Sequence, residues 1–385
     1  MNNIDEKQLM TDFNSTLQYH INNPGISADQ YIRNKDIELG THVMKMGRVY
    51  LDQNYWIYCR DVALGNPRHP DHKQLFEMLV NGVECGKIIC PASHTILEET
   101  LKQDDDITKN LTADIVQRLS KGITLQPFEV LFDAEIRHFL YSQIHSKEAL
   151  CAPEQLAWTY VGNIFSHLSP IIPGCDQNTQ NAFRKYWYDF MSTISFQSLI
   201  KLISSSDANV PQIRSEFYAQ QNYNCKIHEN DYSSFKQVLL IEVKGVLDVY
   251  KENLKGAMLY LYEKGTGHSS KEISKDDSNK YAGYLANIIY HAFNQNKMST
   301  QLPRLHIMSG IHAAIRYNKQ KHHKGDIEDH NNACFALPYC DVFLTEKNLG
   351  HLLTTKPLNY NELYKCRVEW EPHNALLAIE ELLGV

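Results

Sequence analysis

Short apolar runs typical of β-strands occur near both ends of this chain, and each run lies next to acidic residues. The runs are Val49-Tyr50-Leu51, Ile88-Ile89-Cys90 and Val342-Phe343-Leu344. The acidic positions that accompany them are Asp52, Glu98 or Glu99, Asp326 and Asp329, and the pair Asp341 and Glu346. Because the carboxyl ends of parallel strands meet at one edge of an open α/β sheet, these carboxylates can converge there. Mg²⁺ and Mn²⁺ prefer oxygen ligands, so the pattern predicts an α/β fold with a metal site at one sheet edge.

The first part of the chain alternates between strand and helix signals. We expect strands over 49–51 and 87–90 and helices over 54–64 and 72–81, the first of which ends before the turn signal Gly65-Asn66-Pro67. Ser93 is expected to cap the helix that carries Glu98, because a serine oxygen accepts a hydrogen bond from a free N–H of the first turn.

The middle of the chain has a different pattern, in which apolar residues recur at helical spacing. It follows the charged break Asp104-Asp105-Asp106. Helices are expected over 107–120, 128–145, 153–168, 178–203, 232–263 and 271–296. Its aromatic residues are expected in the core or in an interface rather than as a platform for stacking bases. They include Trp158, Tyr160, Trp187 and Tyr188.

The strand and helix signals resume after residue 300. Helices are expected over 303–321, from Asp326 onward and over 374–383, and strands over 341–344 and 364–368. We therefore predict an α/β core that is interrupted by an all-helical insertion. Its parts are a helical N-terminal extension over 1–46, a first core segment over 47–102, the insertion over 103–299 and a second core segment over 300–385.

Composition and charge limit the classes of protein to which this chain can belong. No apolar run approaches the roughly 18 residues needed to cross a bilayer, and Met1 to Met10 contain no apolar signal core. The nine cysteines include no Cys-x-x-Cys pair, so a reducing cytoplasm fits best. A formal net charge of −7 does not indicate a general nucleic-acid binder, although local basic patches can still contact phosphates.

One basic patch lies directly before the third acidic group. It consists of Arg316, Lys319, Lys321, His322, His323 and Lys324. One interpretation is a solvated helix end, and the other is an edge that contacts phosphates beside the acids. Asp326 and Asp341 also have structural alternatives, as a helix cap and as a polar residue at the start of a strand.

The acidic segments resemble the four motifs of the PIN-domain ribonucleases. An apolar strand runs into Asp52 and Asn54, and a second strand is followed by Pro91 and a helix with Glu98 and Glu99. Asp329 is followed by Ala333 and Ala336, the spacing of the third motif. Leu344-Thr345-Glu346 is similar to the fourth motif, with Glu in place of the usual Asp.

This resemblance implies a PIN-like core, a parallel sheet with helices on both faces, and a Mg²⁺ or Mn²⁺ site. It implies catalytic roles for Asp52, Glu98 and Asp329, which would bind the metal together with Asp326, Asp341 and Glu346. The choice of Glu98 over Glu99 stays open, because a helix points only one of two adjacent side chains toward a given site. We expect the substrate to contact Asn54, Arg316, Lys319, Lys321 and Lys324.

The function that follows is a metal-dependent endonuclease, with RNA as a more expected substrate than DNA. The insertion would cover the site or bind a regulatory protein partner, as in a toxin or defence effector. One alternative is an inactive PIN-like module that binds nucleic acid or supports assembly. A rival motif is the spacing of Arg316 and His322, which is similar to that of helical HEPN ribonucleases.

Overall fold

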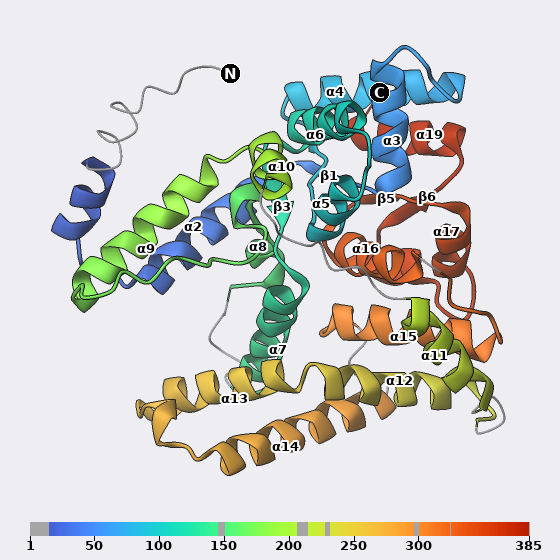
Figure 1. Cartoon of the computed structure of the whole chain (residues 1–385). Coiled ribbons are helices and arrows are strands. Elements are labelled where there is room, and N and C mark those ends of the chain that lie inside the picture. The colour runs from blue at the N-terminus through green and yellow to red at the C-terminus, as the bar shows by residue number, and fades with distance from the viewer. Residues whose placement is uncertain are drawn as a thin grey trace.

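The chain is an α/β protein, mostly helical, built around a parallel sheet of four strands (Figure 1). The computed structural model describes residues 15–144, 151–205, 215–227, 232–295, 300–323 and 325–384. The sheet has the order β2-β1-β5-β6. Its strands are β1 (Gly47–Leu51), β2 (Ile88–Ile89), β5 (Val342–Leu344) and β6 (Arg367–Glu369). Two segments nearly 300 residues apart in the chain therefore form one sheet.

Alternate residues of the strands pack on opposite faces of the sheet, as the period of two requires. Val49, Leu51 and Leu344 face one apolar cluster, whereas Tyr50 and Phe343 face the other. The register pairs Leu51 with Leu344, so β1 and β5 end level with each other. Val49 to Leu51 and the whole of β5 are buried, which explains why these stretches consist of apolar residues.

Helices cover the two faces (Figure 1). The face of Val49 carries α3 (Gln53–Ala63), α4 (Pro70–Glu84), α6 (Asp106–Ser120) and α19 (Pro372–Leu383). The face of Tyr50 carries α15 (Pro303–Tyr317) and α16 (Asp326–Tyr339), and beyond them α7 (Phe128–Ile144), α12 (Phe235–Val249), α13 (Lys251–Thr266) and α14 (Lys275–Asn294). The shorter α5 (His94–Leu101), α17 (Lys347–Thr354) and α18 (Tyr360–Tyr364) follow β2, β5 and α17 in the chain.

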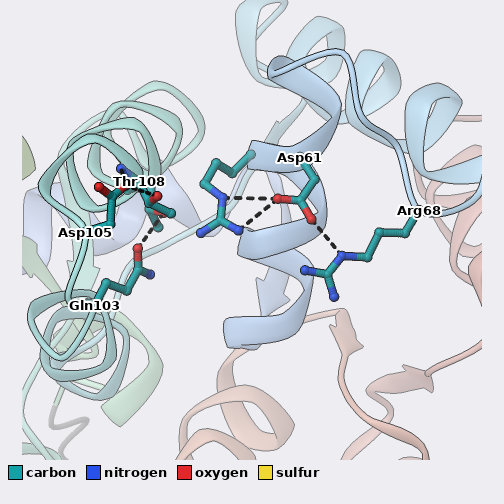
Figure 2. Close-up of polar contacts among 7 residues, drawn as sticks. Asp61, Arg68, Gln103, Asp105 and Thr108 are labelled. Carbon is teal, nitrogen blue, oxygen red and sulfur yellow. Dashed lines mark hydrogen bonds and ion pairs between the residues drawn. The ribbon is translucent and has the colours of Figure 1, made fainter.

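Polar contacts surround Asp61 of α3 and the start of α6 (Figure 2). Asp105 caps α6 by accepting from the Thr108 N–H at 2.7 Å. On α3, Asp61 accepts from both Arg60 and Arg68, at 2.8 and 2.7 Å. Each of these two carboxylates thus has donors within hydrogen-bonding distance.

The expectation of an all-helical insertion over 103–299 is wrong, because two short strands lie within it. β3 (Ile123–Leu125) and β4 (Trp158–Tyr160) pair antiparallel, and Ala92, just after β2, bridges to Thr124. The helix expected over 153–168 is reduced to α8 (Pro153–Leu156) before β4 begins. Aromatic and β-branched residues favour a strand here, and three residues are too few to show a period of two.

Two long helices of the prediction are each divided in two. The segment 178–203 forms α9 (Gln177–Ser192) and α10 (Phe196–Ser204), because Ser195 caps a new helix. The segment 232–263 forms α12 and α13, which meet at Tyr250. Other helices are α2 (Ala28–Val43), which packs beside α9, and α11 (Ser215–Ile227).

The other predicted elements are present, with boundaries that differ by a few residues. Trp158 and Tyr188 are buried, as expected, and Tyr160 and Trp187 are partly buried. Within the described residues, no helix is both long enough and apolar enough to cross a membrane.

Candidate functional site

Asp52 lies where β1 ends and α3 begins. Its carboxylate caps α3 by accepting from the Tyr55 N–H at 3.3 Å, and only 3% of the residue is exposed. The register of β1 and β5 places it level with Thr345, since the Asp52 N–H donates to the Leu344 carbonyl. Asp52 is therefore held at the carboxyl edge of the two central strands.

Glu99, rather than Glu98, faces the sheet edge from α5. Ser93 caps this helix as expected, by accepting from the Ile96 N–H. The Glu99 Oε2 atom is buried without a hydrogen-bond partner, whereas Glu98 lies 3.7 Å from the His94 ring. Adjacent helical residues point about 100° apart, so the cap that starts α5 decides which glutamate turns inward. The structure thus reverses the preference for Glu98.

The first turn of α16 brings three further acids to the same edge. Asp326 accepts from the His323 N–H at 2.7 Å, and Glu328 pairs with Lys102 at 3.1 Å. Tyr218 of α11 donates to Glu328 at 3.4 Å, so the middle of the chain reaches the site through this residue. Asp329 is close enough to Asp52 and Glu99 for their charges to interact.

Burial and the charges of nearby acids raise the pKa values of Asp52, Glu99 and Asp329. Burial raises the pKa of Asp52 to about 7, and the charge of Glu346 adds to it. Burial, then Asp329 and Asp52, raise the pKa of Glu99 to about 8. Burial, then Glu346 and Asp52, raise the pKa of Asp329 to about 8. Within the described residues, none of the three forms an ion pair with a lysine, arginine or histidine.

Asp341 and Glu346 lie at opposite ends of β5. Asp341 precedes the strand and accepts from the Arg48 backbone N–H at 2.8 Å and from its guanidinium at 2.6 and 2.9 Å. Contrary to expectation, Asp341 is therefore not with the other acids, because a residue before a parallel strand lies at the amino edge. Glu346 follows the strand, and its charge reaches Asp52 and Asp329.

A buried polar wall lies behind the acids and was not predicted from the sequence. The Tyr50 hydroxyl donates to Asn332 Oδ1 at 2.7 Å and lies 2.7 Å from the Ser93 hydroxyl. Asn332 Nδ2 and Thr345 Oγ1 are buried without hydrogen bonds of good geometry, although both residues are at most 1% exposed. Buried polar groups normally have partners, so these two atoms indicate room for a bound ligand or water.

A cleft of about 790 Å³ opens beside the acids, within the range of ordinary ligand sites. Its polar lining includes Asp326, Asp329, Glu346, Lys321, His323, Lys347, Asn348, His351 and Lys356. The cations of α17 and of the segment after it were missed by the sequence analysis, because they are scattered singly rather than in a run. The cleft therefore combines acids with cations from the connection between α15 and α16, from α17 and from the segment after α17.

Only part of the predicted basic patch lies in this cleft. Lys321 and His323 line it, but Arg316 pairs with Glu242 at 2.8 Å and lines a separate cavity. Arg316 is thus not placed with the acids. Lys319 is exposed but does not line the cleft, and Lys324 lies outside the described residues. Asn54 is in the first turn of α3, partly buried and also outside the cleft lining.

The ion pair between Arg316 and Glu242 also bears on the rival motif of Arg316 and His322. His322 and His330 are buried and His312 is partly buried, and their ring centroids lie 5.2 to 6.3 Å apart. Burial lowers the pKa of His312 and of His322 to about 4, so both rings are neutral near pH 7. The Arg316 guanidinium pairs with Glu242, and the three histidine rings pack against one another.

The donor set fits a hydrated divalent cation better than a closed metal cage. Among the described residues, no three His, Cys, Asp or Glu side chains are close enough to hold one ion. Asp52, Glu99 and Asp329 nevertheless offer only oxygen, and they raise one another's pKa instead of being neutralised. Mg²⁺ keeps several waters and commonly binds through one or two carboxylates plus substrate phosphates. Such an ion suits these residues.

No protein-family model, curated protein or solved structure matches this chain.

Proposed function

We propose that this chain is a metal-dependent nuclease with a PIN-like core, most simply an endoribonuclease. The observation that carries the proposal is the meeting of Asp52, Glu99 and Asp329, from three separate elements, at the carboxyl edge of a parallel sheet. Their raised pKa values and their lack of ion pairs in the described structure mean that these acids ionise together only with difficulty, and a bound cation would favour their charged forms by displacing the protons. The cations of the adjacent cleft support a polyanionic substrate.

The chemistry required is attack of a water on a phosphodiester, which a divalent ion assists by acidifying the water and stabilising the leaving oxygen. Asp52 and Asp329 would hold the ion, since both face the edge from rigid elements. The Glu99 Oε2 atom, which is buried and unpaired, would accept the proton of the attacking water. Thr345, whose hydroxyl interacts with the Asp52 carboxylate, and Asn332, whose Nδ2 atom is buried without a hydrogen bond of good geometry, would orient water or phosphate.

The test is incubation of the purified protein with single-stranded RNA and DNA in Mg²⁺, Mn²⁺ or EDTA. We expect cleavage of RNA that EDTA abolishes and that Asp52→Asn lowers by about 100-fold or more. Asp341→Asn is the matched control, because it removes the same carboxylate from the other end of the sheet. Circular dichroism of each variant checks that it is folded.

Undiminished cleavage by folded Asp52→Asn would remove this residue from the mechanism. Binding of RNA without cleavage under any of the metal conditions would favour the second candidate, an inactive module that binds nucleic acid. In the part of the chain that the structure describes, no three ligands lie close enough to hold one ion, and this observation keeps the second candidate in view.

A further inference from the structure

Two separate segments supply lysines to the cleft beside the acids. Lys321 comes from the connection between α15 and α16, and Lys347 from the first turn of α17. Lys356 lies just after α17. All three are exposed, and none forms an ion pair with a described residue. Their charges are therefore available to a ligand, although the acids Asp326 and Glu346 line the same cleft.

The cleft lining also restricts which part of a nucleic acid can be recognised. It contains no Phe, Tyr or Trp among the described residues, and its apolar members are aliphatic, such as Leu349 and Leu352. Proteins that hold single strands through their bases stack those bases on aromatic rings. Lysines, in contrast, bind phosphates as point charges. The lining therefore favours contacts to the sugar-phosphate backbone.

The depth of the acids restricts the form of the substrate. Asp52 is 3% exposed, and one Glu99 oxygen is fully buried. Of the three acids, only Asp329 lines the cleft, so a phosphodiester that enters the cleft approaches this residue first. A flexible single strand can bend inward, whereas the backbone of a rigid duplex stays on the outer surface of the helix.

We propose that Lys321, Lys347 and Lys356 bind successive phosphates of single-stranded RNA and lead the chain to the acids, independently of base sequence. This inference rests on the proposed function, which gives the acids their catalytic role. The binding that it describes can nevertheless be measured without cleavage. It replaces Arg316 and Lys319 of the sequence prediction with two lysines near the end of the chain.

The test measures binding of a fluorescent oligouridylate of about 12 nucleotides by anisotropy, over a range of salt concentrations and in EDTA. The variant is the triple substitution Lys321→Ser, Lys347→Ser and Lys356→Ser. The matched control removes three exposed lysines of the α13–α14 hairpin, Lys251→Ser, Lys275→Ser and Lys280→Ser, and changes the net charge equally. Figure 1 shows this hairpin at the far side of α15 from the sheet.

The cleft variant should bind more weakly, and its slope of log affinity against log salt should flatten by about 0.7 for each lost contact. Oligouridylate and oligoadenylate should lose affinity equally, since phosphate contacts do not read bases. An unchanged slope, or an equal loss in the hairpin control, would overturn the proposal.

Cleavage by the same variants separates this inference from the proposed function. If the wild type cleaves RNA and the cleft variant keeps both its KM and its salt slope, the phosphate path is wrong and the nuclease proposal stands. If the slope flattens but no preparation cleaves RNA, the path stands and the nuclease proposal is wrong.

Discussion

Two regions of this protein bury carboxylates, and they differ in what surrounds the charge. In the helical layer, Glu135 of α7 is fully buried beside Arg304 of α15, at 3.2 Å, and accepts from the Tyr339 hydroxyl at 2.7 Å. Aromatic rings enclose the guanidinium, with that of Phe335 at 4.7 Å. At the sheet edge, Asp52, Glu99 and Asp329 have one another as charged neighbours.

The pKa values show how these environments differ. Burial raises the pKa of Glu135 to about 7, and Arg304 opposes that rise. At the edge, burial raises the pKa of Asp329 to about 8, and the neighbouring acids reinforce it. Glu135 has its counter-ion Arg304 within the protein, and their contacts join α7, α15 and α16. The acids of the sheet edge form no such ion pair among the described residues, so they need a proton or an external cation. The first arrangement holds helices together, and the second is the one that we propose for binding a cation.

The largest effect should come from removing the carboxylate charge of the paired region. Glu135→Gln leaves Arg304 charged and fully buried, so the free energy of unfolding should fall by about 3–5 kcal/mol. Urea denaturation measures the loss. The double variant Glu135→Leu with Arg304→Met should recover much of it, and a loss below about 1 kcal/mol in the single variant would contradict the comparison.

At the sheet edge, the adjacent pair Glu98 and Glu99 provides an internal control. Glu99→Gln should lower the rate of RNA cleavage by about 100-fold, because it removes a buried carboxylate that faces Asp52 and Asp329. Glu98→Gln, in the next position, should leave the rate within a factor of a few. If both variants lost kcat/KM equally, the choice between Glu98 and Glu99 would be open again.

Mg²⁺ should stabilise the sheet edge and not the paired region. A ligand of the folded state raises the free energy of unfolding by about 1.4 kcal/mol for each tenfold excess over its Kd. Thermal unfolding should show this increase in the wild type and in Asp341→Asn. The double variant Asp52→Asn with Asp329→Asn should lose the increase, and its persistence there would place the ion elsewhere.

The last prediction concerns pH in the absence of divalent ions. The folded pKa values of Asp52, Glu99 and Asp329, about 7 to 8, lie above the unfolded values of about 4. The folded state then holds more protons between those limits, so stability should fall as pH rises from about 4 to about 8. Asp52→Asn should flatten the slope by at most about 1.4 kcal/mol per pH unit. A steeper fall of stability with pH in this variant would contradict the repulsion among the acids of the sheet edge.

The sequence predicted the parallel strands well, because their signals are local. Val49 to Leu51 and Val342 to Leu344 are continuous apolar runs that end at polar residues, and both form strands of the sheet. Caps such as Ser93 were predicted for the same reason. The strands β3 and β4 were not predicted, since each is only three residues long and is stabilised by pairing with a distant segment.

For the candidate site, the sequence by itself determined that Asp52 ends a strand, and the resemblance to the PIN motifs grouped it with Asp329 of the first turn of α16. Only the tertiary structure decided the rest. It turned Glu99 inward in place of Glu98, and it placed Asp341 at the opposite edge with Arg48. It engaged Arg316 with Glu242 and brought Lys347 and Lys356 into the cleft. A local pattern indicates where an element begins and ends, but the counter-ion of each charge depends on distant segments that packing brings together.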